Sequence, residues 1–303
     1  MINFALIFLC ISTGVIFSKR KLLPADAHKS LNAWVLYVAL PAFSLRFVPE
    51  IEWSSQLFLP ALTPIAVWCG AWVFVRIYDR KKQLSAGSRT ALLITCGLGN
   101  TAFIGFPMIA AYYGESEIRH AIVVDQITFI LFATVGVITI LRTSAGQSKN
   151  AERLFVIKKI FRFPPFLACL AALTVPRLID ISFVNPLLEK LVATMSPMAL
   201  FSIGLQLKLG AVREERKLLT AGLCYKLLLA PGLALALALF LHSTGNMAKI
   251  SIFEAGMSSH ITASLMASQH NLHPKYCSLV VGMGIILGFV TSTVWYLILP
   301  HII

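Results

Sequence analysis

The segment Gly97-Leu-Gly-Asn-Thr-Ala-Phe-Ile-Gly-Phe-Pro107 places helix-breaking and polar residues in the middle of an apolar stretch. Gly97, Gly105 and Pro107 predict a break in a helix, because glycine loosens a helix and proline removes a backbone donor. Broken backbone inside a membrane persists only where it is buried in protein or lines a polar cavity. The ends of the half-helices then point partial charges at that cavity, and N-terminal ends favour anions such as carboxylates.

A second segment of the same kind, Gly256-Met-Ser-Ser-His260-Ile-Thr262, lies at nearly the same offset in the second half of the chain. Gly256 predicts a second break there. The simpler interpretation is that the glycines allow close helix packing and that Pro107 makes a kink, since both residue types are common in membrane helices. Paired interruptions at corresponding positions favour the binding site of a transporter. The candidate substrate-binding residues of the two segments are Gly99, Asn100, Thr101, Ser258, Ser259 and His260.

Ionisable residues within apolar stretches form a second group of candidates, because a charge in hydrocarbon costs ~3 kcal/mol and should face protein or water. Asp125, with Gln126 beside it, is the first candidate for coupling to a proton or cation, since a carboxylate removed from water binds a proton more readily. A structural ion pair between Asp125 and Lys226, the other coupling candidate, is equally open. We expect Glu254 to be a solvated residue near a membrane face, and His260 to be a hydrogen-bonded packing residue.

Composition identifies the elements that must position these residues as membrane helices. Apolar residues make up 57% of the 303 residues, charged residues only 13%, and the mean hydropathy is +0.80. Soluble domains carry about one quarter charged residues. The net charge of +13 does not indicate a nucleic-acid partner, because the basic residues form short clusters between apolar stretches, as in cytoplasmic loops.

Several classes of chemistry are excluded by the motifs. The six cysteines stand singly in apolar stretches, so neither a metal site nor a disulfide framework is predicted. The sequence has no phosphate loop, metal cluster or nucleophile elbow, so we expect no cofactor and no ATP-driven activity. An intramembrane enzyme is disfavoured because the adjacent Ser259 and His260 point to different sides of a helix.

Ten apolar segments approach the ~20 residues that a membrane span requires. The longest loop divides the chain into a first half at residues 1–141, a basic cytoplasmic linker at 142–162 and a second half at 163–303. Five helices per half, an odd number, place the halves in opposite orientations, which predicts inverted repeats. The ten segments are approximately 2–17, 30–47, 57–78, 88–113, 118–141, 163–179, 186–209, 217–242, 249–271 and 275–300.

The distribution of positive charge predicts the orientation. With both termini outside, most of the 26 Lys and Arg residues fall in or beside the inside loops, as the positive-inside rule requires. The apolar run from Ile2 to Phe17 precedes the basic cluster Ser18-Lys-Arg-Lys21, which indicates a retained first helix and not a signal peptide. We therefore expect a multi-pass protein of a bacterial inner membrane with periplasmic termini. The linker could form a short interfacial helix.

Five segments along the chain carry a resemblance to a known family. They are Asn32 with Ala39-Leu-Pro41 and Ser44; Asn100-Thr101 with Gly105-Phe-Pro107 and Tyr113-Gly114; Met198-Ala-Leu-Phe-Ser-Ile-Gly-Leu205; Lys226 with Ala230-Pro-Gly232; and Asn271-Leu-His-Pro274. In this order they resemble the auxin efflux carrier family, which includes the plant PIN auxin exporters and bacterial malonate or malate carriers.

The resemblance implies an all-α membrane fold of ten helices, arranged as two inverted five-helix repeats whose broken helices 4 and 9 cross. It also implies a scaffold of helices 1, 2, 6 and 7, through which such proteins form homodimers, and a moving transport domain. Asn100 falls on the family's crossover asparagine and is expected to contact substrate, and Ser44 is similar to a position lining the same pocket. The family's polar position on helix 5 falls on Asp125 or Gln126.

These observations together predict a secondary active or potential-driven transporter of a small organic anion, working by alternating access. One charge crossing 100 mV gains about 2.3 kcal/mol, so export of an anion needs no coupled ion. Two alternatives are a membrane sensor or scaffold that binds a ligand without moving it, and a sodium-coupled symporter of the bile-acid type.

Overall fold

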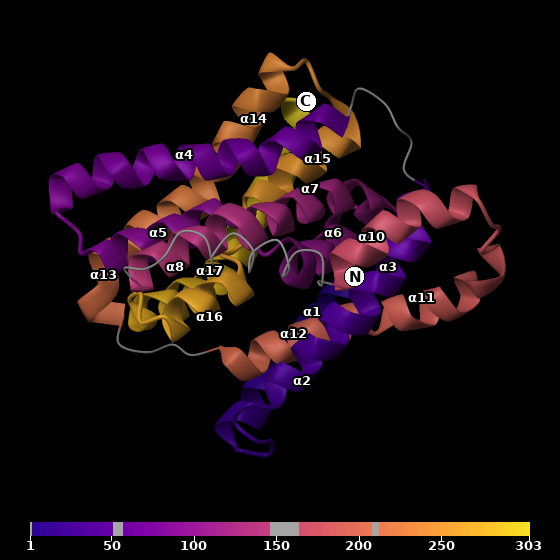
Figure 1. The fold of residues 1–303 in the computed structure, drawn as a ribbon, viewed down its shortest axis with the longest axis horizontal. Helices are drawn as coiled ribbons and strands as arrows, with labels where there is room; N and C mark the ends of the chain where they lie inside the picture. The colour runs from indigo at the N-terminus through magenta and orange to yellow at the C-terminus, as the bar shows by residue number, and fades with distance from the viewer. Residues whose placement is uncertain (1, 51–56, 146–163, 208–211) are drawn as a thin grey trace. The chain divides into compact units, whose positions relative to one another are not determined.

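The computed structural model describes residues 2–50, 57–145, 164–207 and 212–303, and the elements in these ranges are helices (Figure 1). Contacts divide the chain into two compact units. The first comprises Met1–Trp53, Ala102–Ile122 and Ile160–Leu207, and the second comprises Ser54–Thr101, Val123–Lys159 and Lys208–Ile303. Both units therefore contain residues from both halves of the sequence.

The first unit is built around the pair formed by α1 and α12, which lie side by side in Figure 1. α2 packs on α12, α3 packs on α10 and α11, and α6 packs on α1. The unit contains the predicted scaffold segments 1, 2, 6 and 7 except residues 208–209, together with Ala102–Ile122 from segments 4 and 5. Its helices are α1 (Ile2–Lys19), α2 (Ala27–Trp34), α3 (Leu40–Phe47), α6 (Phe106–Tyr112), α10 (Pro164–Thr174), α11 (Asn185–Ala193) and α12 (Met195–Gln206).

The second unit is built around α4, which packs on α5, α14 and α15, and around α17, which packs on α13 and α16. α7 (Ile118–Leu131) begins in the first unit and ends in the second. The other helices of the second unit are α4 (Phe58–Lys82), α5 (Ala86–Gly97), α8 (Val137–Ala145), α13 (Val212–Cys224), α14 (Ala230–Phe240), α15 (Gly245–Ala255), α16 (Ile261–Gln269) and α17 (Pro274–Ile298).

Six helical stretches among the described residues are long and apolar enough to cross a membrane. This confirms the helical membrane class, whereas the count of ten spans and the inverted repeat stay predictions. The fourth and ninth predicted segments fall short because each is interrupted, so neither half reaches the ~20 residues of a span. The six stretches are Ala27–Glu50, Phe58–Lys82, Glu115–Ser144, Ser182–Gln206, Arg213–Phe240 and Pro274–His301.

The side chains of α14 show the distribution expected of a helix that faces lipid. Ala230, Ala234 and Ala238 are fully buried, whereas Leu239 and Phe240 are exposed. The small residues form the packed face and the large apolar residues form the outer face, the reverse of a soluble helix. Membrane helices pack in this way because small side chains allow close approach while large apolar ones are stable against lipid tails.

Several helices contain a π-helical turn, and in three cases a proline explains its position. A proline removes one hydrogen bond and its ring clashes with the carbonyl of residue i−4, and a π turn accommodates both effects. Each of these turns ends two residues before the proline: Val35–Ala39 before Pro41, Thr101–Gly105 before Pro107, and Tyr225–Leu229 before Pro231.

The predicted linker at 142–162 falls mostly outside the described residues, and with it the suggestion that the linker forms an interfacial helix. Its first residues, from Arg142, continue α8 as far as Ala145, beyond the predicted end of the fifth segment at residue 141. The helix continues because Arg142, Thr143 and Ser144 are compatible with a helical end, and Thr143 and Ser144 donate to carbonyls one turn earlier.

Candidate functional site

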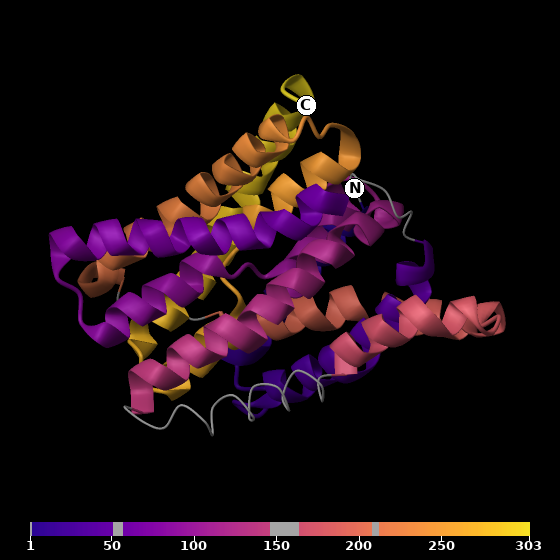
Figure 2. The same ribbon diagram turned by 45° about the horizontal axis from the view of Figure 1, so that its top comes forward.

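Two interrupted helices of the second unit meet at the candidate site. α5 ends at Gly97, and Leu98 has the extended backbone of a strand. α15 ends at Ala255, and the next helix, α16, begins only at Ile261. In Figure 2 the chain leaves α5 as a coil instead of continuing the helix. The helix is thus interrupted in both segments. The second interruption occurs although no proline lies between Gly245 and Thr262.

The two extended segments pair with each other. An isolated antiparallel bridge joins Gly99 and Ser259. The backbone N–H of Asn100 donates to the Ser258 carbonyl at 2.8 Å, and the N–H of His260 donates to the Leu98 carbonyl at 3.0 Å. These bonds satisfy part of the backbone that the breaks free from the helices, as buried backbone groups require.

The predicted breaking residues have different roles. Gly97 and Gly256 stand at the ends of α5 and α15, as predicted. Gly105 and Pro107 do not stand at a break: Gly105 is helical, and Pro107 lies in the first turn of α6. Proline is tolerated there because the preceding π turn, Thr101–Gly105, accommodates the hydrogen bond that the ring removes and its clash with the carbonyl of residue i−4. The break precedes Pro107 by several residues, and the proline instead accounts for the π turn.

Two side chains at the paired segments are buried without a hydrogen-bond partner among the described residues. The amide Nδ2 of Asn100 and the hydroxyl of Ser258 have none, although the residues are only 3% and 1% exposed. Leaving a buried donor unpaired costs about 1–3 kcal/mol. Such groups call for an explanation, and donors available for a bound ligand provide one.

The neighbouring polar residues are already engaged. The Ser259 hydroxyl donates to the Thr95 carbonyl at 2.8 Å. Nδ1 of His260 accepts from the N–H of Ala263 at 3.2 Å and so caps α16, while its ring stacks on Phe132 with 5.1 Å between centroids. Because Nδ1 accepts a bond, the neutral ring carries its proton on Nε2. This is the arrangement of a hydrogen-bonded packing histidine.

Asp125 lies against the first turn after the break. The Thr101 hydroxyl donates to its Oδ1 at 2.5 Å, and Nε2 of Gln126 lies 3.3 Å from its Oδ2. The carboxyl group is buried, with 8% of the residue exposed. Within the described chain Asp125 forms no ion pair with Lys226, because no carboxylate oxygen lies within 4.0 Å of that ammonium. The sequence-based alternative of a structural ion pair between these two residues is therefore wrong.

Lys226 instead reaches the end of α15. Its residue is 2% exposed, and its Nζ donates to the carbonyl of Ala255, the last residue of α15, at 2.8 Å. The same nitrogen lies so close to Gly99 that a Cβ at that position would stand 3.1 Å from it. A side chain at position 99 would therefore require the Lys226 ammonium to shift by a few tenths of an ångström. Lys226 stands in the π turn that precedes Pro231.

Glu254 differs from its expected role. It is 1% exposed and not a solvated residue near a membrane face, because it lies in the last turn of α15, whose residues from Ile250 onward are buried. Neither carboxyl oxygen has a hydrogen-bond partner in the described structure. Gly99, Thr101, Lys226 and Glu254 line a small cavity of about 10 Å³ in the second unit. That volume is about the minimum for one water molecule.

Ser44, the remaining candidate, lies in α3 of the first unit, where it is buried. Its place in a common pocket with Asn100 stays a prediction. Among the described residues, no group of three His, Cys, Asp or Glu side chains could hold a metal ion.

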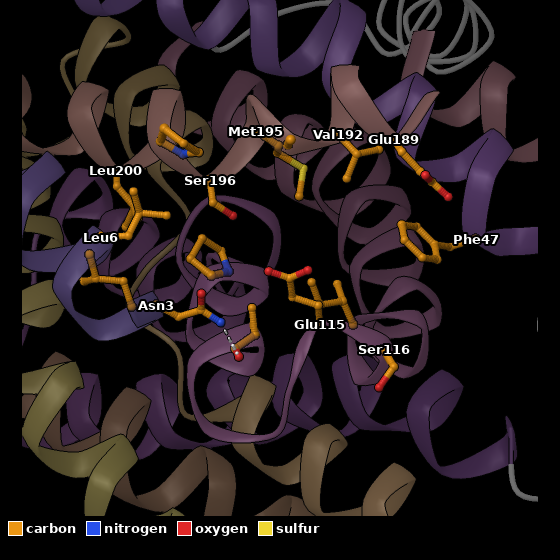
Figure 3. Close-up of a pocket in the computed structure, with 16 residues that line it drawn as sticks. Asn3, Leu6, Phe47, Glu115, Ser116, Glu189, Val192, Met195, Ser196 and Leu200 are labelled. Atoms are coloured by element: carbon orange, nitrogen blue, oxygen red, sulfur yellow. Dashed lines mark hydrogen bonds between the residues drawn. The ribbon is translucent and has the colours of Figure 1, made fainter. Parts of the chain in front are cut away.

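A larger cavity of about 460 Å³, which the sequence did not predict, lies in the first unit. Figure 3 shows Asn3, Glu115 and Ser196 around it. The charged groups lining it are carboxylates, Glu115 and Glu189, and the guanidinium of Arg46 pairs with Glu189 at 3.0 Å. The described residues that line this cavity include no lysine or arginine to bind an anion, and Glu115 would repel one, so the paired breaks of the second unit are the better candidate for an anion site.

An all-helical apolar fold with two paired helix breaks defines a class of polytopic membrane proteins that includes carriers. Residues 1–296 match the model of the family described as membrane transport protein, and the chain belongs to this family, the auxin efflux carrier family. The resemblance found in the sequence is thereby confirmed.

Two archaeal relatives support the same assignment. An uncharacterised transporter of Methanothermobacter thermautotrophicus is 23% identical over 289 residues, covering 94% of both chains. An uncharacterised transporter of Methanocaldococcus jannaschii is 22% identical over 263 residues, covering 84% of both. The similarity in each case extends over most of the chain, as expected for proteins that share one architecture.

Proposed function

We propose that this chain is a secondary transporter that moves a small organic anion, a mono- or dicarboxylate, by alternating access around the paired breaks. The transport family and the apolar helices support membrane transport. The anion is the finer part of the proposal. It rests on the donors that the breaks leave without partners.

The observation that carries the proposal is the unpaired amide of Asn100 beside the unpaired hydroxyl of Ser258. The Asn100 N–H bonds the Ser258 carbonyl, so the two residues are neighbours across the bridge. α16 begins at Ile261, directly after this segment, and the helix that leads into α6 begins at Thr101. Both helix N-terminal ends carry partial positive charge, which favours a carboxylate.

The rest of the proposal follows the expectations from charge and family. The chain would span the cytoplasmic membrane ten times, with both termini outside and two inverted repeats at 1–141 and 163–303. The elements of the first unit would form the scaffold, with a homodimer formed through it, and those of the second unit the moving domain. Drive by membrane potential alone is sufficient for export of an anion.

A ligand screen on the purified protein tests the site. Acetate, lactate, malonate and malate are added in turn, and thermal unfolding is followed, since a ligand stabilises the folded state by mass action. We expect at least one carboxylate to raise Tm in a saturable way. Asn100→Ala and Ser258→Ala should reduce that shift, because each removes a donor.

Thr139→Ala is the matched control, because the Thr139 hydroxyl is exposed and bonds only the Val135 carbonyl of its own helix. This variant should keep the full shift. An undiminished shift in both Asn100→Ala and Ser258→Ala would place the carboxylate elsewhere. Binding without any flux would instead identify the sensor alternative.

A further inference from the structure

We infer that the ammonium of Lys226 is a built-in cation that fills a monovalent cation site at the ends of the two broken helices, so that this carrier binds no sodium ion there. The part of the inference that concerns ion coupling rests on the proposed function, because only a transporter has a coupled ion. Its structural claim, a cation site filled by the chain's own lysine, stands on contacts within the second unit alone.

The position of the ammonium is the first step. Nζ of Lys226 donates to the carbonyl of Ala255, where α15 ends. It also lies against Gly99, two residues after the end of α5. The last carbonyls of a helix lack helical partners and carry the negative end of the macrodipole. A positive charge is therefore stabilised at this place, where two helices end close together.

The second step is the carboxyl group beside it. Glu254 is 1% exposed, neither of its oxygens has a hydrogen-bond partner in the described structure, and it lines the same small cavity as Lys226 and Gly99. The two side chains interact electrostatically, and Asp125 is the other charged group that acts on Glu254. The Glu254 carboxyl group and the Ala255 carbonyl at the end of α15 are oxygen groups of the kind that bind small cations, and the ammonium of Lys226 already occupies the carbonyl.

The third step is a comparison with carriers of related architecture. In transporters with discontinuous helices, unwound carbonyls and half-helix C-terminal ends coordinate sodium ions or protons. In this chain the equivalent chemistry is supplied by a tethered ammonium, which reaches the site on the π turn before Pro231. An ammonium that is tethered to the chain cannot leave the site as a sodium ion can, so it is not transported as a coupled sodium ion would be.

Removing the lysine should expose the site. In Lys226→Ala the carbonyl of Ala255 and the carboxyl of Glu254 would face an enlarged cavity with room for a small cation. Purified wild type and variant are compared in sodium chloride, methylammonium chloride and N-methyl-D-glucamine chloride at equal ionic strength. We expect the variant's Tm to rise saturably, by about 3 °C or more, in sodium or methylammonium relative to the bulky cation.

Two further variants separate a cation site from a general salt effect. Lys226→Met fills the space without a charge, so its Tm should be the same in the three salts. Lys226→Ala combined with Glu254→Gln removes the carboxylate ligand, so the response to sodium and methylammonium should fall.

Wild-type protein should show no preference among the salts, and this measurement needs no variant to fold. Saturable stabilisation of wild type by sodium would overturn the inference, as would an equal Tm of Lys226→Ala in all three salts. These readouts do not depend on flux, so a failure of the proposed carboxylate binding would be seen separately in the carboxylate screen, and a failure of transport in a proteoliposome flux assay.

Discussion

Asn100 and Ser258 are buried, and the side-chain amide of the one and the hydroxyl of the other have no hydrogen-bond partner in the described structure. Ser259 and His260, which have similar chemistry, are bonded to Thr95 and Ala263. Polar residues of a binding site and of a packing contact look alike in a sequence. Their hydrogen bonds distinguish the two kinds of residue. A polar group in a packing contact has a hydrogen-bond partner within the protein, whereas a polar group in a binding site is left to bond the ligand.

The contact between Thr101 and Asp125 supports the first prediction. Thr101→Val removes the donor to a buried carboxyl group at nearly constant volume, so the free energy of unfolding should fall by about 1–3 kcal/mol. Thr128→Val is the matched control: Thr128 is also buried, but its hydroxyl bonds only the Val124 carbonyl one turn earlier. Thermal unfolding of the two purified variants measures the difference, and an equal loss in both would contradict this role of Thr101.

The sequence identified which polar residues lie within the helices, but it did not predict which groups their side chains contact. Asp125 and Lys226 were each expected to face protein or water, and both are buried in protein, but the lysine reaches the end of α15 and not the Asp125 carboxylate. The prediction that Glu254 is a solvated residue near a membrane face is wrong, because the residue is buried. Glu254 lies two residues before Gly256, and the predicted break at Gly256 places Glu254 at a helix end inside the protein.

At the scale of elements, the helix breaks depend on features that a local pattern only partly reveals. Pro107 suggested the first break, yet the chain leaves the helix at Leu98, where it pairs with a segment about 160 residues away in sequence. The second break occurs without a proline. Each break is stabilised by the other through the bridge between Gly99 and Ser259, and no single-segment pattern contains that information.

Three of the π turns show the opposite case, in which a proline in the sequence accounts for the turn, whereas the π turn Phe132–Gly136 has no proline directly after it. Pro41, Pro107 and Pro231 each follow a π turn at the same spacing. The rule that a proline in a helix displaces the hydrogen bonds of the preceding turn would have located them. The turn before Pro231 has a functional consequence, because it carries Lys226.

The close contact between α1 and α12 supports a prediction about stability. A Cβ at Gly204 would stand 2.3 Å from the Ile11 carbonyl, so Gly204→Ala must push the two helices apart. We expect a loss of about 1–3 kcal/mol and a Tm lower by several degrees. Gly232→Ala, in α14, meets no atom within 4 Å and should be neutral or slightly stabilising, because alanine is the better helix former. Equal effects of the two substitutions would contradict this packing.

At the scale of the whole molecule, the compact units do not follow the halves of the sequence. Helices from 1–53 and 160–207 belong to one unit, and helices from 54–101 and 208–303 to the other. The division follows the scaffold and transport groups that the family resemblance implied only in part, because the first unit also contains Ala102–Ile122. Hydropathy and charge counting could not predict it, because they identify spans and their orientation but contain no information about which spans pack together.

Flux through reconstituted proteoliposomes tests the central claim that the paired breaks form the transport site. The substrate is the carboxylate that stabilises the purified protein, and its accumulation against a preloaded unlabelled pool is measured. Wild type should show carboxylate-dependent uptake. Asn100→Ala should lower it about tenfold or more, since a hydrogen bond to a charged group contributes ~1.5–3 kcal/mol. Thr139→Ala should transport as wild type. Uptake by Asn100→Ala equal to that of wild type would contradict the account.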